Sequence, residues 1–65
     1  MNKNYIDVFA VCLHETDKAL LVDVGDEEVW IPKSQIDYDA SEVCGEGDEG
    51  DLVITEWIAE QKGLI

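Results

Sequence analysis

Hydrophobic and polar residues alternate from Tyr5 to Glu15, which predicts a β-strand over residues 5–15. The middle of this strand is apolar on both sides, as is typical of a strand that bends over a small barrel or is flanked by a helix. One side is expected to carry Ile6, Val8, Ala10, Cys12 and His14, and the other side Asp7, Phe9, Val11, Leu13 and Glu15.

A β-hairpin is predicted over residues 19–31. The strand pattern runs from Ala19 to Val24, Gly25 and Asp26 supply turn chemistry, and the pattern resumes from Glu28 to Ile31. Pro32 ends the hairpin, because proline has no amide proton to donate to an interior ladder. Residues 33–36 are predicted to form one helical turn, with Ile36 pointing inward.

Residues 37–50 form an acidic segment with six carboxylates and three glycines. This composition predicts a mobile, solvated loop, and Val43 is its expected anchor to the core. A short strand follows over residues 52–54.

A terminal helix of about two turns is predicted after this strand, too short to be stable alone. Thr55 is its expected N-cap and Gly63 its C-terminal cap, while Trp57 and Ile58 are expected to dock it on the sheet. The predicted fold is a single α+β domain over residues 1–65. It has a small four-stranded antiparallel, curled or barrel-like sheet and one short C-terminal helix, in the order β-β-β-loop-β-α.

Charge narrows the possible functions. The 65 residues include 16 Asp and Glu, four Lys and no Arg, for a net charge of −12. Phosphate is usually bound by Arg, and four scattered Lys do not build a stripe that follows a nucleic-acid backbone. We therefore expect no binding to nucleic acid or to an anionic membrane. Hydrophobic residues make up 46% of the chain, which predicts a folded core inside an acidic shell.

The cellular setting is expected to be cytoplasmic. Cys12 and Cys44 are too few for a disulfide framework and have no metal-ligand spacing, so both are predicted to be reduced thiols, with Cys12 in the core. No apolar run approaches the ~20 residues of a membrane span. Residues 1–5 lack the basic and apolar regions of a secretion signal.

The chain offers no set of nucleophile, base and orienting residue, so we expect that the protein is not an enzyme and binds no cofactor. His14, the single histidine, is interpreted as an ordinary surface or turn residue. A segment starting at Asp37 partly resembles a calcium-binding loop, because oxygens fall at its first, third and fifth positions and Asp48 at its twelfth. Glu42 replaces the glycine that the sharp turn needs, and no metal site is predicted.

The aromatic residues supply an alternative kind of site. Trp57 is predicted to lie in the core, whereas Trp30 has only Glu28 and Pro32 as neighbours on its strand face. Trp30 and Tyr38 are therefore the candidate aromatic contacts for a protein partner, since tryptophan is enriched in interface hot spots.

The carboxylates are the main candidates for partner binding. A net charge of magnitude 12 exceeds the ~2–8 that keeps a small domain soluble. The natural specific partner is a protein with a basic groove, because complementary charge steers association. The residues predicted to bind the partner are Asp23, Asp26, Glu27 and Glu28 of the hairpin, together with Asp37, Tyr38, Asp39, Glu42, Glu46, Asp48 and Glu49.

Three stretches resemble small hypothetical proteins carried by bacteriophages and mobile elements: ALLVDVGDEEVWIPKSQI (19–36), GDEG (47–50) and EWIAEQKGL (56–64). In size, acidity and expected fold, the chain also resembles anti-CRISPR proteins that act on type I systems as acidic DNA mimics. This resemblance implies a CRISPR surveillance complex as the target, at its site for target DNA or PAM, in the cytoplasm of a bacterial host cell. It assigns no role to any single residue.

The functional hypothesis from the sequence is an inhibitor that occupies the basic DNA-binding groove of such a complex. The first alternative is a small β-barrel interaction module that binds through Trp30 and Tyr38, with its acidity serving only solubility. The second alternative is a calcium-stabilised module.

Overall fold

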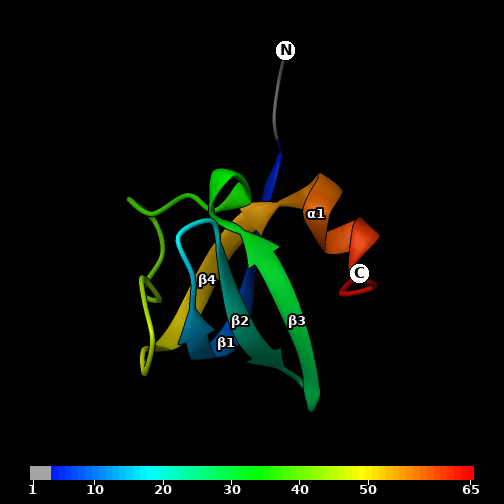
Figure 1. Cartoon of the computed structure of the whole chain (residues 1–65). Helices are drawn as coiled ribbons and strands as arrows, with labels where there is room; N and C mark the ends of the chain where they lie inside the picture. The colour runs from blue at the N-terminus through cyan, green and yellow to red at the C-terminus, as the bar shows by residue number, and fades with distance from the viewer. Residues whose placement is uncertain (1–3) are drawn as a thin grey trace.

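A computed structural model describes residues 4–65 and confirms the predicted fold class (Figure 1). The four strands form one antiparallel sheet in the order β3-β2-β1-β4. The elements are β1 (Tyr5–Glu15), β2 (Ala19–Val24), β3 (Glu27–Pro32), the 3₁₀ turn η1 (Lys33–Gln35), β4 (Glu49–Thr55) and α1 (Glu56–Gln61). The sheet does not close into a barrel, because β3 and β4 form its two opposite edges.

The predicted hairpin is present as β2 and β3, joined by a two-residue turn. Gly25 and Asp26 have φ angles of 57° and 72°, and Val24 pairs directly with Glu27. Two successive positive φ angles are the signature of a type I′ turn, whose twist matches that of the strands it joins. Glycine and aspartate tolerate this conformation better than most residues, so the turn follows from local chemistry.

β1 contains a bulge that changes the predicted alternation of its side chains. Cys12 pairs with Val22, but the next pair along the strand is His14 with Leu21, so Leu13 has no partner. An inserted residue shifts everything after it to the other side of the sheet. His14 therefore shares a face with Val11, and Glu15 shares one with Cys12, which corrects the prediction for both residues.

α1 is capped as expected. The Thr55 hydroxyl accepts a hydrogen bond from the Ile58 amide at 3.2 Å. At the other end Gly63 has a φ of 71°, and the Leu64 amide donates to the Ala59 carbonyl at 2.8 Å, which completes a Schellman motif. The short helix buries Ile58 and Ala59, whereas Trp57 is 58% exposed. The prediction of a core position for Trp57 is thus wrong, because successive helical residues point about 100° apart.

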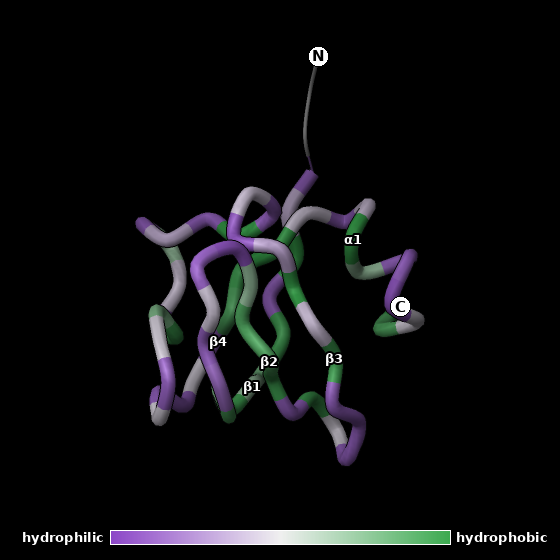
Figure 2. The backbone as a smooth tube through the Cα atoms, in the orientation of Figure 1, coloured by the Kyte–Doolittle hydropathy of each residue, from purple (hydrophilic) through white to green (hydrophobic). Residues whose placement is uncertain are grey.

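The core lies on one face of the sheet, which we call the covered face. It contains the fully buried side chains of Ala10, Leu20, Val22, Ile31, Leu52 and Ile54. α1 adds Ile58 and Ala59 to this cluster, and the segment between β3 and β4 adds Ile36 and Val43. Cys12, Ile36 and Val43 are buried as predicted. Figure 2 shows the apolar stretches of β1, β2 and β4 that meet in this core.

Within residues 4–65, no helix has the length and apolar character that crossing a bilayer requires. Residues 1–3, part of the N-terminal segment considered for a secretion signal, lie outside the described residues.

Candidate partner-binding face

The acidic segment before β4 is fastened along the border of the sheet. The Glu42 amide donates to the Asp51 carbonyl at 2.7 Å, and the Glu42 carboxylate accepts from the Asp51 amide at 2.9 Å. Further along, the Cys12 amide donates to the Asp48 carbonyl at 2.8 Å and the Cys12 carbonyl accepts from Gly47 at 2.9 Å. The segment predicted to be a mobile, solvated loop is therefore hydrogen-bonded along β4 and to the end of β1.

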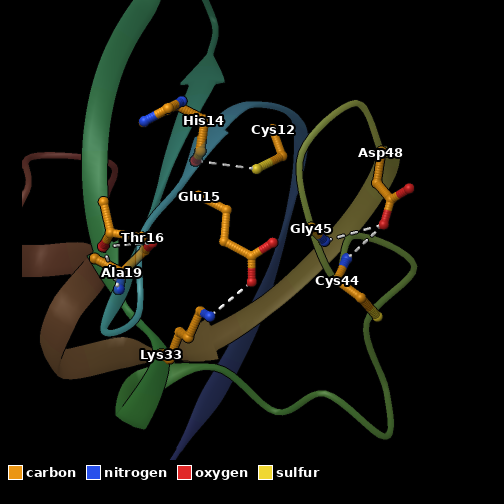
Figure 3. Close-up of polar contacts among 9 residues, drawn as sticks. All are labelled: Cys12, His14, Glu15, Thr16, Ala19, Lys33, Cys44, Gly45 and Asp48. Atoms are coloured by element: carbon orange, nitrogen blue, oxygen red, sulfur yellow. Dashed lines mark hydrogen bonds and ion pairs between the residues drawn. The ribbon is translucent and has the colours of Figure 1, made fainter.

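Several carboxylates of this segment bind its own backbone. One Asp48 oxygen accepts from the amides of Cys44 and Gly45 at 2.9 and 3.0 Å (Figure 3). One Asp37 oxygen accepts from the Asp39 amide at 3.1 Å. Such side-chain bonds to nearby amides are the usual way in which aspartate builds a turn.

This arrangement does not favour the calcium alternative. Asp37 and Asp48 each support a separate turn, so the two ends of the segment that resembles a calcium-binding loop already have structural partners. Across residues 4–65 there is no group of three or more His, Cys, Asp or Glu side chains placed to hold a metal ion.

The face of the sheet opposite the core carries both carboxylates and aromatic rings, and we call it the open face. The strand register places Asp51 directly beside Phe9, and Asp23 between Val11 and Glu28. Glu49 flanks Val11 on its other side. The open face consists of Tyr5, Asp7, Phe9, Val11, His14, Ala19, Leu21, Asp23, Glu28, Trp30, Pro32, Glu49, Asp51, Val53 and Thr55. Val53 and Thr55, at one end of this face, are buried.

Three large rings on this face are accessible: Tyr5, which is 45% exposed, and Phe9 and Trp30. Phe9 is 61% exposed and Trp30 is 42% exposed. The His14 ring lies against Trp30 in an edge-to-face arrangement, with ring centroids 6.4 Å apart and an interplanar angle of 83°. His14 Nδ1 also lies 3.1 Å from a carboxylate oxygen of Glu46, which ties the acidic segment to the end of the open face. Single exposed apolar residues are ordinary, but three exposed rings on one sheet face form a patch of the kind found at interaction sites.

The open face has no positive side chain among the described residues. Lys18 lies in the turn between β1 and β2, and Lys62 lies at the end of α1. Lys33 forms an ion pair with Glu15 at 2.6 Å, away from this face (Figure 3). The hydrogen bond that Lys33 donates to the Glu15 carboxylate raises the pKa of Lys33. Within residues 4–65, the five carboxylates of the open face therefore have no lysine beside them, and Asp23 Oδ1 is buried without a hydrogen-bond partner.

The eleven predicted contact residues do not form one cluster. Asp23, Glu28 and Glu49 lie on the open face, Asp26 lies at the hairpin tip, and Glu27 pairs with Val24 on the covered side. The others belong to the border segment: Asp37, Tyr38, Asp39, Glu42, Glu46 and Asp48. Tyr38 is 36% exposed, and burial raises the pKa of its hydroxyl.

Sequence reasoning missed two carboxylates of the open face, Asp7 and Asp51. Both are polar positions within apolar strands, since Asp7 lies between Ile6 and Val8 and Asp51 directly precedes Leu52–Ile54. Charge density along the chain drew attention to residues 37–49 instead. The pairing of β1 with β4, which places Asp51 directly opposite Phe9 and so near Asp7, is a long-range contact that local charge density does not reveal.

Comparison with protein-family models, curated proteins and solved structures gives no match for this chain. No family is therefore shown. The resemblance to phage-borne anti-CRISPR proteins stays a prediction.

Proposed function

We propose that this protein binds, through its open face, a cationic groove of a nucleic-acid-binding protein and so competes with the nucleic acid. The observation that carries the proposal is the open face itself. It holds five carboxylates among three exposed rings, and no lysine of the described chain neutralises them.

Electrostatics favours such a partner. The protein carries a net charge of −12 and has principal extents of 32 × 23 × 19 Å. B-DNA carries one phosphate charge per ~1.7 Å, or roughly 19 over the longest of these extents. The protein thus offers a charge of the same order as the duplex it would displace. Complementary fields of this kind steer association and raise its rate at low salt.

The exposed rings supply apolar contact area, which a surface made of carboxylates alone lacks. Exposed carboxylates paired with a partner's cations contribute little each, because water and salt screen them. Aromatic side chains at the centre of an interface exclude water and supply much of the binding free energy. Phe9 and Trp30 lie among the carboxylates, so one surface supplies both the attraction and the apolar contact.

The particular target proposed is a type I CRISPR surveillance complex, at its site for target DNA or PAM. Support for this choice comes from the resemblance in size, acidity and fold, and from the open face as a surface able to enter a basic groove. No catalytic step or cofactor is part of the proposal.

The alternative of an interaction module that binds through Trp30 and Tyr38 together is less favoured by the geometry. Trp30 lies in β3 at one edge of the sheet. The Asp37 amide, next to Tyr38, bonds the Val53 carbonyl of β4 at the other edge. Of these two residues, only Trp30 belongs to the exposed apolar surface of the open face.

The test is a competition assay with a purified type I surveillance complex and fluorescent target duplex. The native protein is expected to block duplex binding. The triple variant Asp7→Asn, Glu49→Gln, Asp51→Asn is expected to need at least about tenfold more protein for the same inhibition, because charge pairs at interfaces contribute ~1.5 kcal/mol or more. An absence of inhibition by the native protein would remove this target.

The matched control changes the same number of carboxylates away from the open face. Asp26→Asn, Asp39→Asn and Glu60→Gln also bring the net charge from −12 to −9, since three carboxylates are neutralised. All three side chains are exposed, and asparagine tolerates the positive φ of position 26. Equal weakening by both triple variants would show that total charge, and not the open face, determines inhibition.

A further inference from the structure

The open face places carboxylates beside two of its exposed aromatic rings, Phe9 and Trp30. Phe9 in β1 has Asp51 directly opposite on β4 and Asp7 two residues earlier on its own strand. Directly opposed side chains have Cβ atoms ~5 Å apart, and residues i and i+2 on one strand are ~7 Å apart. Phe9 is 61% exposed, so its ring is reachable from solution between these two carboxylates.

Trp30 has a similar setting on β3. Glu28 lies two residues earlier on the same strand, and Asp23 of β2 lies diagonally across, since Glu28 pairs with Asp23 and Trp30 with Leu21. Diagonal neighbours of this kind are within reach of long side chains, at ~7–8 Å. The His14 ring packs against Trp30 edge to face, which holds one neighbour of the indole in place.

We propose that the open face selects arginine, and not lysine, side chains of its partner, with one guanidinium on Phe9 and another on Trp30. This inference rests on the proposed function and names the contact chemistry of the same surface. A guanidinium is planar, stacks on an aromatic ring and at the same time donates two parallel hydrogen bonds to a carboxylate. The pairing of ring and carboxylate at both positions fits this dual mode.

Lysine fits the same surface less well. Its ammonium is a compact, strongly hydrated point charge, and it does not present a flat face to a ring. It satisfies the carboxylates of the open face but gains less from Phe9 and Trp30. Selectivity for arginine over lysine therefore measures the contribution of the rings, whereas the absolute affinity for either cation measures the carboxylates.

The test compares octa-arginine and octa-lysine peptides, which have equal length and charge, by isothermal titration calorimetry of the full chain at about 0.1 M salt, where distant charges are screened. Octa-arginine is expected to bind about fivefold or more tightly than octa-lysine, from two contacts of the strength seen for exposed cation–π pairs. The variants Phe9→Leu and Trp30→Leu are each expected to reduce this ratio, and the double variant to bring it close to one.

Trp57→Leu is the matched control, because Trp57 is exposed to 58% on α1 and lies outside the open face. It is expected to leave the ratio unchanged. Equal affinity of the native protein for both peptides would overturn the arginine inference, as would an equal loss of selectivity in the Trp57 variant.

The outcomes also separate this inference from the proposed function. If both peptides bind equally and both are lost in the triple variant Asp7→Asn, Glu49→Gln, Asp51→Asn, the acidic face stands as a cation-binding surface and only the preference for arginine fails. If neither peptide binds the native protein, both the inference and the cationic partner fail.

Discussion

The two faces of the sheet are built from the same strands yet differ in what lies above them. Before the bulge in β1, even-numbered positions such as Ala10 point into the covered face, under α1 and the segment that contains Val43. Odd-numbered positions before the bulge point into the open face, where Phe9 is 61% exposed. The covered face holds only apolar cluster residues at its centre, whereas the open face mixes rings with five carboxylates.

This difference shows which residues the fold depends on. Removal of apolar side chains from water stabilises the fold by ~25 cal/mol per Å², and that gain is made on the covered face. The open face leaves Phe9 and Trp30 partly in water and places five like charges near one another, neither of which stabilises the protein. Because folding does not require this composition, binding is the explanation we propose for it.

The largest difference between the faces is expected in truncations of apolar side chains. Leu52→Ala on the covered face, where Leu52 is fully buried, should lower the free energy of unfolding by ~2–5 kcal/mol. Phe9→Ala on the open face should change it by less than about 1 kcal/mol, because the ring is largely exposed. Urea denaturation measures both, and a similar loss in the two variants would contradict the division into faces.

A smaller difference in stability is expected between variants of two kinds of carboxylate. One kind accepts hydrogen bonds from backbone amides, and the other lies on the open face. Asp48→Ala removes the acceptor for the Cys44 and Gly45 amides and should cost ~1 kcal/mol, as the loss of a capping side chain does. Asp51→Asn should leave stability unchanged or slightly higher, because one of several like charges is removed. If Asp51→Asn destabilises the protein as much as Asp48→Ala, the open-face carboxylates have a structural role that this account lacks.

Stability is expected to depend on pH through a buried group of the covered face, the Cys12 thiol. Burial raises the pKa of the Cys12 thiol above its ordinary value of 9.0. The unfolded chain therefore loses this proton at a lower pH than the folded protein does. The contribution of the Cys12 thiol to the free energy of unfolding is therefore fully present below about pH 9 and is lost as the pH rises through the pKa of the thiol in the folded protein. Tyr38, whose pKa burial also raises, acts in the same direction.

Urea midpoints of the native protein and of Cys12→Val, measured from neutral to alkaline pH, test this effect. The midpoint of the native protein should fall more steeply above pH 9 than that of the variant, while the neutral-pH difference between them reports packing alone. Parallel curves over the whole range would show that Cys12 does not contribute.

The smallest expected effect is that of added salt on the free energy of unfolding. Mutual repulsion among the carboxylates weakens as salt shortens the Debye length from ~30 Å at 0.01 M to ~8 Å at physiological ionic strength. The native protein should therefore gain stability with added salt, by less than about 1 kcal/mol. The open-face triple variant should gain less than the off-face triple variant. An equal gain in both would mean that repulsion is not concentrated on the open face.

The local elements of the fold were predictable from single residues. The turn at Gly25 and Asp26, the cap at Thr55 and the stop at Gly63 depend on conformations and hydrogen bonds that a few neighbouring residues decide. Burial of Cys12, Ile36 and Val43 also followed from the pattern, because each is apolar within a polar or alternating stretch.

Features that depend on tertiary contacts were not predictable in this way. The bulge at Leu13 has no local signal, and it moves His14 to the open face. Trp57 lies outside the core because α1 is only six residues long and Ile58 and Ala59 occupy its buried side. The acidic segment is bonded to β4 through Glu42 and Asp51, which are separated by nine residues. Only the folded chain shows that three of the eleven predicted contact residues share a face with Asp7 and Asp51.

The two tryptophans allow a direct test, since Trp30 is on the open face and Trp57 is on α1. Each indole N–H gives its own signal in an ¹⁵N-correlated NMR spectrum, and Trp57→Leu assigns the pair. On titration with octa-arginine, we expect the Trp30 signal to shift in a saturable way while the Trp57 signal stays in place. A shift of Trp57 without Trp30, or no saturable shift of either, would contradict the open face as the binding surface.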